Sequence, residues 1–109
     1  MKKDLRISEL NDVYGELLTE RQREIIKSYY DFDLSLAEIS ENYGVTRQAV
    51  RDAIVKGEQQ LETYERLLRV IEGRERMAAS IEQIRLLIEE ENYSKAQEVL
   101  DELAKIIQE

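Results

Sequence analysis

Two arginines and a glutamine near the middle of the chain have side chains of the kind that read bases in nucleic acids. Arg47, Gln48 and Arg51 are spaced so that they would share the first two turns of one helix. Arginine can make paired hydrogen bonds to guanine, and glutamine can make them to adenine. Residues 46–57 carry three basic residues against one acidic residue, so phosphate contacts are also expected there. The predicted nucleic-acid-binding residues are Thr46, Arg47, Gln48, Arg51 and Lys56.

The surrounding segment, SLAEISENYGVTRQAVRDAI over residues 35–54, predicts two short helices that would position those side chains. Ser35 has the properties of an N-cap, and Glu38 three residues later completes a capping box. Gly44 can adopt a positive φ, so it can end the first helix and turn the chain sharply. Thr46 would then cap the second helix. The sides expected to face a core carry Leu36, Ile39, Ser40, Tyr43, Val50, Ala53 and Ile54.

Two short helices joined by a tight turn, with base-reading side chains at the start of the second, are typical of a helix-turn-helix. The alternative is an ordinary helical hairpin that binds no nucleic acid. Such a hairpin does not require two arginines and a glutamine at one end of one helix. The pattern therefore favours the helix-turn-helix.

Residues 17–61 resemble region 4 of bacterial sigma factors, and the whole chain resembles the small bacterial YlxM family. The resemblance lies in LLTERQREIIKSYY, then in DLSLAEISENYGVTRQAV, and then in a charged helical tail. It implies an all-α protein of the sigma region 4-like, winged-helix-like DNA-binding class, with a three- to four-helix bundle and a C-terminal helical extension. It also implies a regulatory protein that is not a sigma factor. The family is linked to the signal recognition particle, and hence to protein targeting, mainly because its gene lies beside the genes of that pathway.

The composition independently predicts an all-α fold and argues against an enzyme. The chain has 109 residues, no proline, four glycines, no cysteine and no histidine. Disulfides, zinc sites and most nucleophile–base pairs are thereby excluded, and no cofactor is expected. Asp31 and Asp33 could suggest a metal site, but a turn with solvated carboxylates is the favoured interpretation because no further ligand lies nearby. The start of the chain lacks the apolar run of a signal peptide, and no segment is apolar for long enough to insert in a membrane, so a cytoplasmic location is expected.

The formal charge of −8 argues against a simple DNA-binding protein, because phosphate contacts usually need a basic face. From residue 73 onward the chain has five basic residues against nine acidic ones. Binding to nucleic acid should therefore be weak in a monomer and sensitive to salt, or should need a dimer or a partner.

The chain is predicted to divide into a helix-turn-helix domain at 8–60 and a C-terminal helical extension at 61–109. Ser8 is the expected cap of a helix through about Leu18, and Thr19 with Gln22 forms a capping box for the next helix. Three basic residues of that second helix could touch a DNA backbone, or could belong to a solvated face, which is the favoured alternative. They are Arg21, Arg23 and Lys27.

A heptad stripe runs along the helix that begins near Thr46 and continues past the expected domain boundary. The stripe suggests a homodimer, because its distal part would lie beyond the helix-turn-helix core. Gly57 falls on the stripe, which indicates either a close helix crossing or a tolerated glycine. Gly73 either ends this helix or marks a bend in one long helix, and Ser94 with Gln97 is predicted to cap the last helix. The predicted dimer interface, to which the tail helices also contribute, is Leu61, Tyr64, Leu68 and Ile71.

Two functions remain open from the sequence. The first is a helix-turn-helix DNA-binding regulatory protein. The second is an adaptor that has kept the fold but binds protein components or RNA of the signal recognition particle without reading DNA. Net acidity and the apolar tail favour the second, and the geometry of the helix-turn-helix favours the first, because that motif reads DNA rather than RNA.

Overall fold

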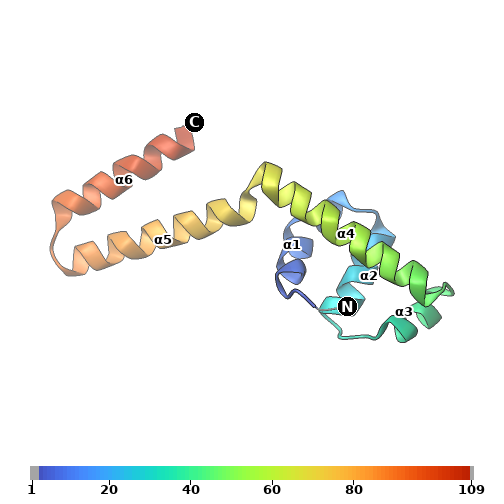
Figure 1. Cartoon of the computed structure of the whole chain (residues 1–109). Helices are drawn as coiled ribbons and strands as arrows, with labels where there is room; N and C mark the ends of the chain where they lie inside the picture. Colours follow the sequence, from blue (N-terminus) through green and yellow to red (C-terminus); the bar gives the residue numbers. More distant parts are fainter. Residues whose placement is uncertain (1–2, 109) are drawn as a thin grey trace. The chain divides into compact units, whose positions relative to one another are not determined.

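The computed structural model describes residues 3–108, which form helices with no strand among them. Two compact units divide the chain, unit 1 at Met1–Val70 and unit 2 at Ile71–Glu109. The division follows residue 70, ten positions beyond the boundary expected at residue 60. Figure 1 shows the elements in order: α1 (Arg6–Tyr14), the 3₁₀ turn η1 (Gly15–Leu17), α2 (Glu20–Tyr30), α3 (Leu36–Tyr43), α4 (Arg47–Leu68), α5 (Val70–Glu89) and α6 (Tyr93–Gln108).

Local capping signals determine where the central helices begin and end. The side chain of Ser35 accepts from the Glu38 amide, and the reciprocal bond completes the capping box of α3. Thr19 and Gln22 form the same arrangement at α2. Gly44 ends α3 with a φ of 66°, in the left-handed region that costs glycine little. Thr46 then accepts from the Ala49 amide and starts α4. These predictions are confirmed.

The first helix differs from its prediction. It begins at Arg6, and its N-cap position, Leu5, supplies no side-chain bond. Ser8 lies inside α1 and donates from its hydroxyl to Asp31, so it is not a cap. The α-helix ends at Tyr14 and gives way to the 3₁₀ turn η1 instead of continuing to about Leu18.

Unit 1 is built around α4, which packs against α1, α2 and α3 (Figure 1). The buried face of α4 runs through Val50, Ile54, Gly57, Leu61 and Glu65. This contact explains why residues far apart in the sequence share one interior. The side chains with almost no exposure are Leu10, Ile26, Ile39, Val50, Ile54 and Leu61.

The core of unit 1 therefore extends farther along α4 than the sequence analysis assumed. Leu61 has 0% of its surface exposed, so it is a core residue and cannot form a dimer interface. Tyr64 packs its ring against Tyr14, with centroids 6.2 Å apart, and donates from its hydroxyl to the Leu17 carbonyl. Of the four predicted interface residues, only Leu68 is a largely exposed apolar side chain, at 56%, while Ile71 is 3% exposed.

Gly57 allows α4 to cross closely over α2. A Cβ atom at this position would lie 2.4 Å from Cδ1 of Ile26, which is itself fully buried. Carbon atoms in favourable contact are about 3.5–4.0 Å apart, so no larger residue fits without movement of the core. Of the two alternatives for Gly57, the structure supports the close crossing.

We expect Gly57→Ala to destabilise the protein, although alanine is the better helix former. Overpacking of a core costs about 1–3 kcal/mol, whereas the gain in helix propensity is about 1 kcal/mol. Ile26→Val removes the clashing Cδ1 atom, so the double variant should lose less than the sum of the two single losses. Gly73→Ala is the matched control, because nothing lies within 4 Å of its Cβ position and the same substitution should stabilise α5. Equal effects of the two glycine substitutions in chemical denaturation would contradict the close crossing.

The break between α4 and α5 lies at Arg69, not at Gly73. Arg69 has a φ of 55°, in the left-handed region, and its amide still bonds to the carbonyl of Glu65. Gly73 lies inside α5. Both alternatives for Gly73, a helix end and a bend, are therefore replaced by a break four residues earlier.

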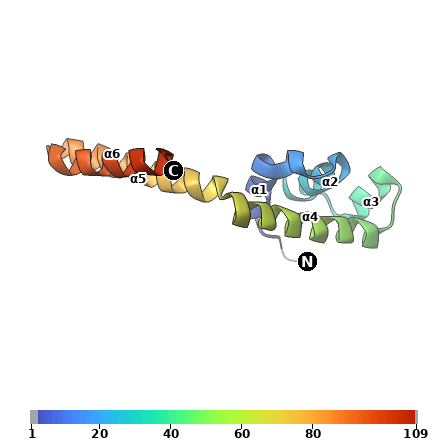
Figure 2. The ribbon, with the colours of Figure 1, turned by 90° about the horizontal axis from the view of Figure 1, so that it is seen from above.

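Unit 2 is a hairpin of α5 and α6 (Figure 2). The turn between them uses Glu91 at a φ of 59°. Asn92 caps α6, because its side chain accepts from the Lys95 amide, and Ser94 lies within the helix. The prediction of a Ser94 cap is wrong. The hairpin has a small interior of Leu87, Ala96 and Val99, with Ile84 packed against it.

Candidate nucleic-acid interface

The first turns of α4 present the predicted base-reading side chains to solvent. Arg47, Gln48 and Arg51 are all exposed, and Thr46 precedes them as the cap. Val45 lies in the turn, half-buried, with its amide bonded to the Ser40 carbonyl at 3.1 Å. This bond joins the turn to α3. It therefore helps to orient the N-terminal end of α4, which carries Arg47, Gln48 and Arg51.

The structure groups Arg47 and Arg51 but not Lys56. At four residues apart, the two arginines stand one above the other on the same face of α4. Lys56 follows Arg47 by nine residues, about 13 Å along the axis and half a turn around it. Lys56 is exposed, but it belongs to a different side of the helix. A ligand that contacts both the arginine pair and Lys56 would have to pass around the side of α4.

Gln48 already has a partner within its own helix. Its Nε2 donates to Oδ1 of Asp52 at 2.8 Å. To read adenine, the amide must exchange this bond for bonds to the base. Asp52 also follows Arg51 directly in the sequence, so it reduces the positive charge of the patch.

The basic residues of α2 contact neighbouring groups of the protein, and Arg21 and Lys27 remain exposed, which fits the alternative of a solvated face. Arg21 lies over the ring of Tyr43, 5.4 Å from its centroid, and donates to the Tyr43 carbonyl at 3.3 Å. A cation is favourable at the C-terminal end of α3, where the helix carbonyls are exposed. Arg23 pairs with Glu24, and Lys27 lies over the ring of Phe32. The contact of Arg21 with Tyr43 joins α2 to α3 over 22 positions, so no local sequence pattern could have indicated it.

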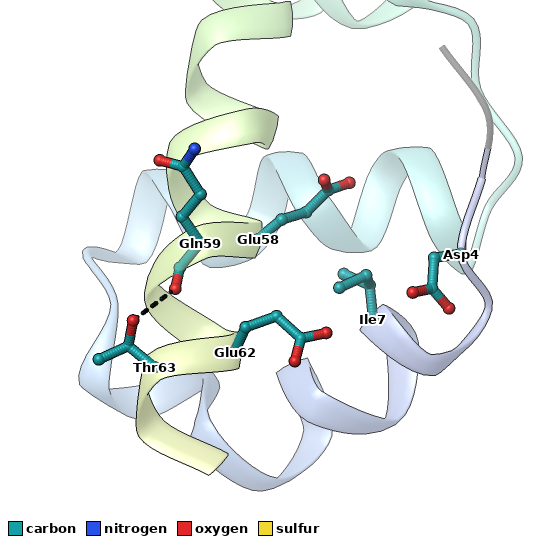
Figure 3. A pocket seen from close by; sticks show the side chains of 6 residues that line it. All are labelled: Asp4, Ile7, Glu58, Gln59, Glu62 and Thr63. Carbon is teal, nitrogen blue, oxygen red and sulfur yellow. Dashed lines mark hydrogen bonds between the residues drawn. The ribbon is translucent and has the colours of Figure 1, made fainter. Parts of the chain in front are cut away.

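A groove on unit 1 is acidic (Figure 3). The groove has a volume of about 390 Å³. Glu62 pairs with Arg6 at 3.0 Å, and Glu58 accepts from the hydroxyl of Tyr30. Burial, and then the bond to Glu58, raise the pKa of Tyr30 well above its ordinary value, so this hydroxyl stays protonated and donates. Carboxylates here would repel phosphate. The lining residues are Asp4, Ile7, Glu58, Gln59, Glu62 and Thr63.

Asp31 and Asp33 bond to different partners. Asp31 accepts from Ser8, and Asp33 pairs with Lys3, which lowers the pKa of that carboxyl. Within residues 3–108 no group of three acidic side chains is arranged to hold a metal ion. In the same part of the chain, every helix is too short or too polar to cross a bilayer.

The fold and the site together define a helix-turn-helix protein. A sequence profile of the UPF0122 family, described as "Putative helix-turn-helix protein, YlxM / p13 like", matches residues 1–106. The chain belongs to the UPF0122 family, which confirms the resemblance to YlxM.

Relatives from several bacteria match along almost their whole length. The UPF0122 protein of Desulforamulus reducens is 41% identical over 107 residues, which cover 98% of this chain and 92% of the relative. The UPF0122 protein of Clostridium kluyveri is 40% identical, with 98% and 96% covered. The corresponding protein of Symbiobacterium thermophilum is 40% identical over 100 residues, with 92% and 94% covered.

Proposed function

We propose that the protein is a cytoplasmic DNA-binding regulatory protein that places the N-terminal turns of α4 in the major groove. Arg47, Gln48 and Arg51 face the base edges, and Thr46 contacts phosphate. The observation that carries the proposal is the joint exposure of these side chains directly after the left-handed turn at Gly44. Helix-turn-helix proteins use this end of the second helix to contact bases.

The charge distribution predicts low affinity and, for a single subunit, a weak dependence on salt. The binding helix offers two close arginines against Asp52, and the chain as a whole carries −8. Each phosphate contact changes the slope of log K against log salt by about −0.9 on B-DNA. Few contacts therefore give a shallow slope and a low affinity for a single subunit, so two copies of α4 on one DNA would bind more tightly than one.

A second candidate is an adaptor of the signal recognition particle that binds its protein components or its RNA and does not read DNA. The net acidity favours it, and so do the apolar side chains that unit 2 leaves exposed. The bond between Gln48 and Asp52 also favours it, because an engaged glutamine is less available to a base. The link to that particle comes from the family resemblance alone.

The test is charge reversal at the start of α4. Arg47→Glu with Arg51→Glu should weaken binding to a mixed DNA and RNA pool by roughly a hundredfold or more, because each well-placed arginine contributes about 1–3 kcal/mol. Fluorescence anisotropy at low ionic strength measures the binding, and circular dichroism should show unchanged helicity because both side chains are exposed.

Arg66→Glu with Lys95→Glu is the matched control, since it makes the same change in net charge at exposed positions outside the first turns of α4. Equal loss in the control would show that only overall charge matters. Unchanged binding by the Arg47 and Arg51 variant would refute α4 as the reader. A wild type that binds no nucleic acid at low salt would favour the adaptor.

A further inference from the structure

Both helices of unit 2 carry a heptad pattern of apolar residues. On α5, Met77, Ile81, Ile84 and Ile88 follow spacings of four, three and four. On α6, the residues at 96, 100, 103 and 107 repeat the same spacings. Heptads of this kind are typical of helices that pack against one or more other helices.

The hairpin buries only one edge of each stripe. Its own interior takes Ala96 and, packed against it, Ile84 from the stripes, together with Leu87 and Val99 beside them. The other edge stays in solvent, with exposed fractions of 47%, 51%, 49%, 46% and 72% for Met77, Ile81, Ile88, Leu100 and Ile107. These five residues form the open face of the hairpin.

The open face lies on one side of the hairpin. Successive residues are about 100° apart around a helix. Relative to Ile84, the positions of Ile81 and Ile88 are therefore rotated by about 60° and 40°. Relative to Ala96, Leu100 and Ile107 are rotated by about 40° and 20° in the same sense. Because α5 and α6 run in opposite directions, side chains rotated in the same sense along the two helices point to the same side of the hairpin. Both helices thus contribute to the open face on one side of the hairpin.

The ends of the hairpin differ in charge. The end at the turn carries Glu89, Glu90 and Glu91, all exposed. The opposite end is balanced, because Arg74, Arg76 and Lys105 are matched by Glu72, Glu75 and Glu102. A second hairpin laid antiparallel on the first would bring each acidic end beside a balanced end, whereas a parallel arrangement would place the two acidic ends together, where they repel.

A hollow at the end opposite the turn offers a place for a partner's side chain. It lies between α5 and α6 and is lined mainly by apolar atoms, among them those of Met77, Leu103, Ile106 and Ile107. In a helix bundle, side chains of one helix enter such hollows in its neighbour.

We propose that the open face binds the open face of a second copy of this chain, antiparallel, so that two hairpins form a four-helix bundle. This interface differs from the one predicted from the α4 stripe, since Leu61 is buried in unit 1. The inference goes beyond the proposed function, because the dimer forms whether or not α4 reads DNA. A symmetric pair is the commonest assembly of soluble proteins and needs only one self-complementary surface.

Light scattering at micromolar concentration tests the interface. The wild type should have twice the chain mass of 12.9 kDa, and Ile81→Glu with Leu100→Glu should have the single mass. Leu68→Glu is the control, because Leu68 is equally exposed but lies on α4 in unit 1, so this variant should stay dimeric. A monomeric wild type would overturn the proposal, as would dissociation by Leu68→Glu while the unit 2 variant stays dimeric. Circular dichroism must show that the variants remain helical.

Cysteine crosslinking tests the orientation, since the chain has no cysteine of its own. Ile81 lies near the middle of α5, so in an antiparallel pair its two copies are close to the symmetry axis. A short bismaleimide should join Ile81→Cys to itself across the dimer. Two copies of Ile88 would be about 20 Å or more apart, so Ile88→Cys should not crosslink. Efficient crosslinking at position 88, or none at position 81, would refute the antiparallel arrangement.

Discussion

Leu61→Ala is expected to lower the free energy of unfolding by about 2–5 kcal/mol. The side chain has 0% exposure, and it lies on the face of α4 that packs against α1 and α2. Truncation removes its apolar contacts and leaves a cavity that the surrounding helices can fill only in part. This loss is a large share of the total free energy of unfolding, which is about 5–15 kcal/mol for domains of this size.

Leu67→Ala provides the comparison for this prediction. Leu67 has the same side chain in the same helix but is 70% exposed, so its removal should change stability by about 0.5 kcal/mol or less. Urea denaturation followed by circular dichroism gives both values, at one fixed protein concentration because association also contributes to stability. If the two substitutions cost the same, Leu61 is not a core residue.

Tyr14→Phe should have the second largest effect, a loss of about 1.5–3 kcal/mol. The hydroxyl of Tyr14 donates to Oε1 of Glu65 at 2.5 Å and accepts from the Val70 amide at 3.0 Å. Glu65 is only 6% exposed, so the removal of a donor leaves its carboxylate less well satisfied in a place that water hardly reaches. Phenylalanine keeps the ring, and hence the apolar packing.

Tyr64→Phe is the matched control for that substitution. The hydroxyl of Tyr64 donates to a backbone carbonyl at 3.3 Å in an exposed position, where water can replace it. Its loss should cost about 0.5 kcal/mol or less. The same urea titration compares the two variants. A Tyr14→Phe protein as stable as the Tyr64→Phe protein would show that the bond to Glu65 contributes little.

Elements that depend on neighbours in the sequence could be predicted from it. The capping boxes at Thr19 and Ser35, the turn at Gly44 and the cap at Thr46 each involve residues at most three positions apart. They position the start of α4, which is why the candidate site could be located before the structure was known.

Elements that depend on distant contacts could not be predicted. The core reaches Leu61 because α1 and α2 pack along α4, and a heptad stripe cannot reveal which helix covers it. The engagement of Arg21 by Tyr43 depends on the same kind of long-range packing. At the start of α6, Ser94 and Gln97 fit the sequence pattern of a capping box. The tight turn at Glu91 nevertheless makes Asn92 the N-cap of the helix.

Between α4 and α5 there is no loop, only the single residue Arg69 in the left-handed conformation. An L-residue in the left-handed region is less stable than in a right-handed helix by about 1–2 kcal/mol, and glycine would adopt the same φ more readily. Neither interior includes the Arg69 side chain, which is exposed. Mutation at this position can therefore change the path of the backbone between the two units without removing a side chain from either core.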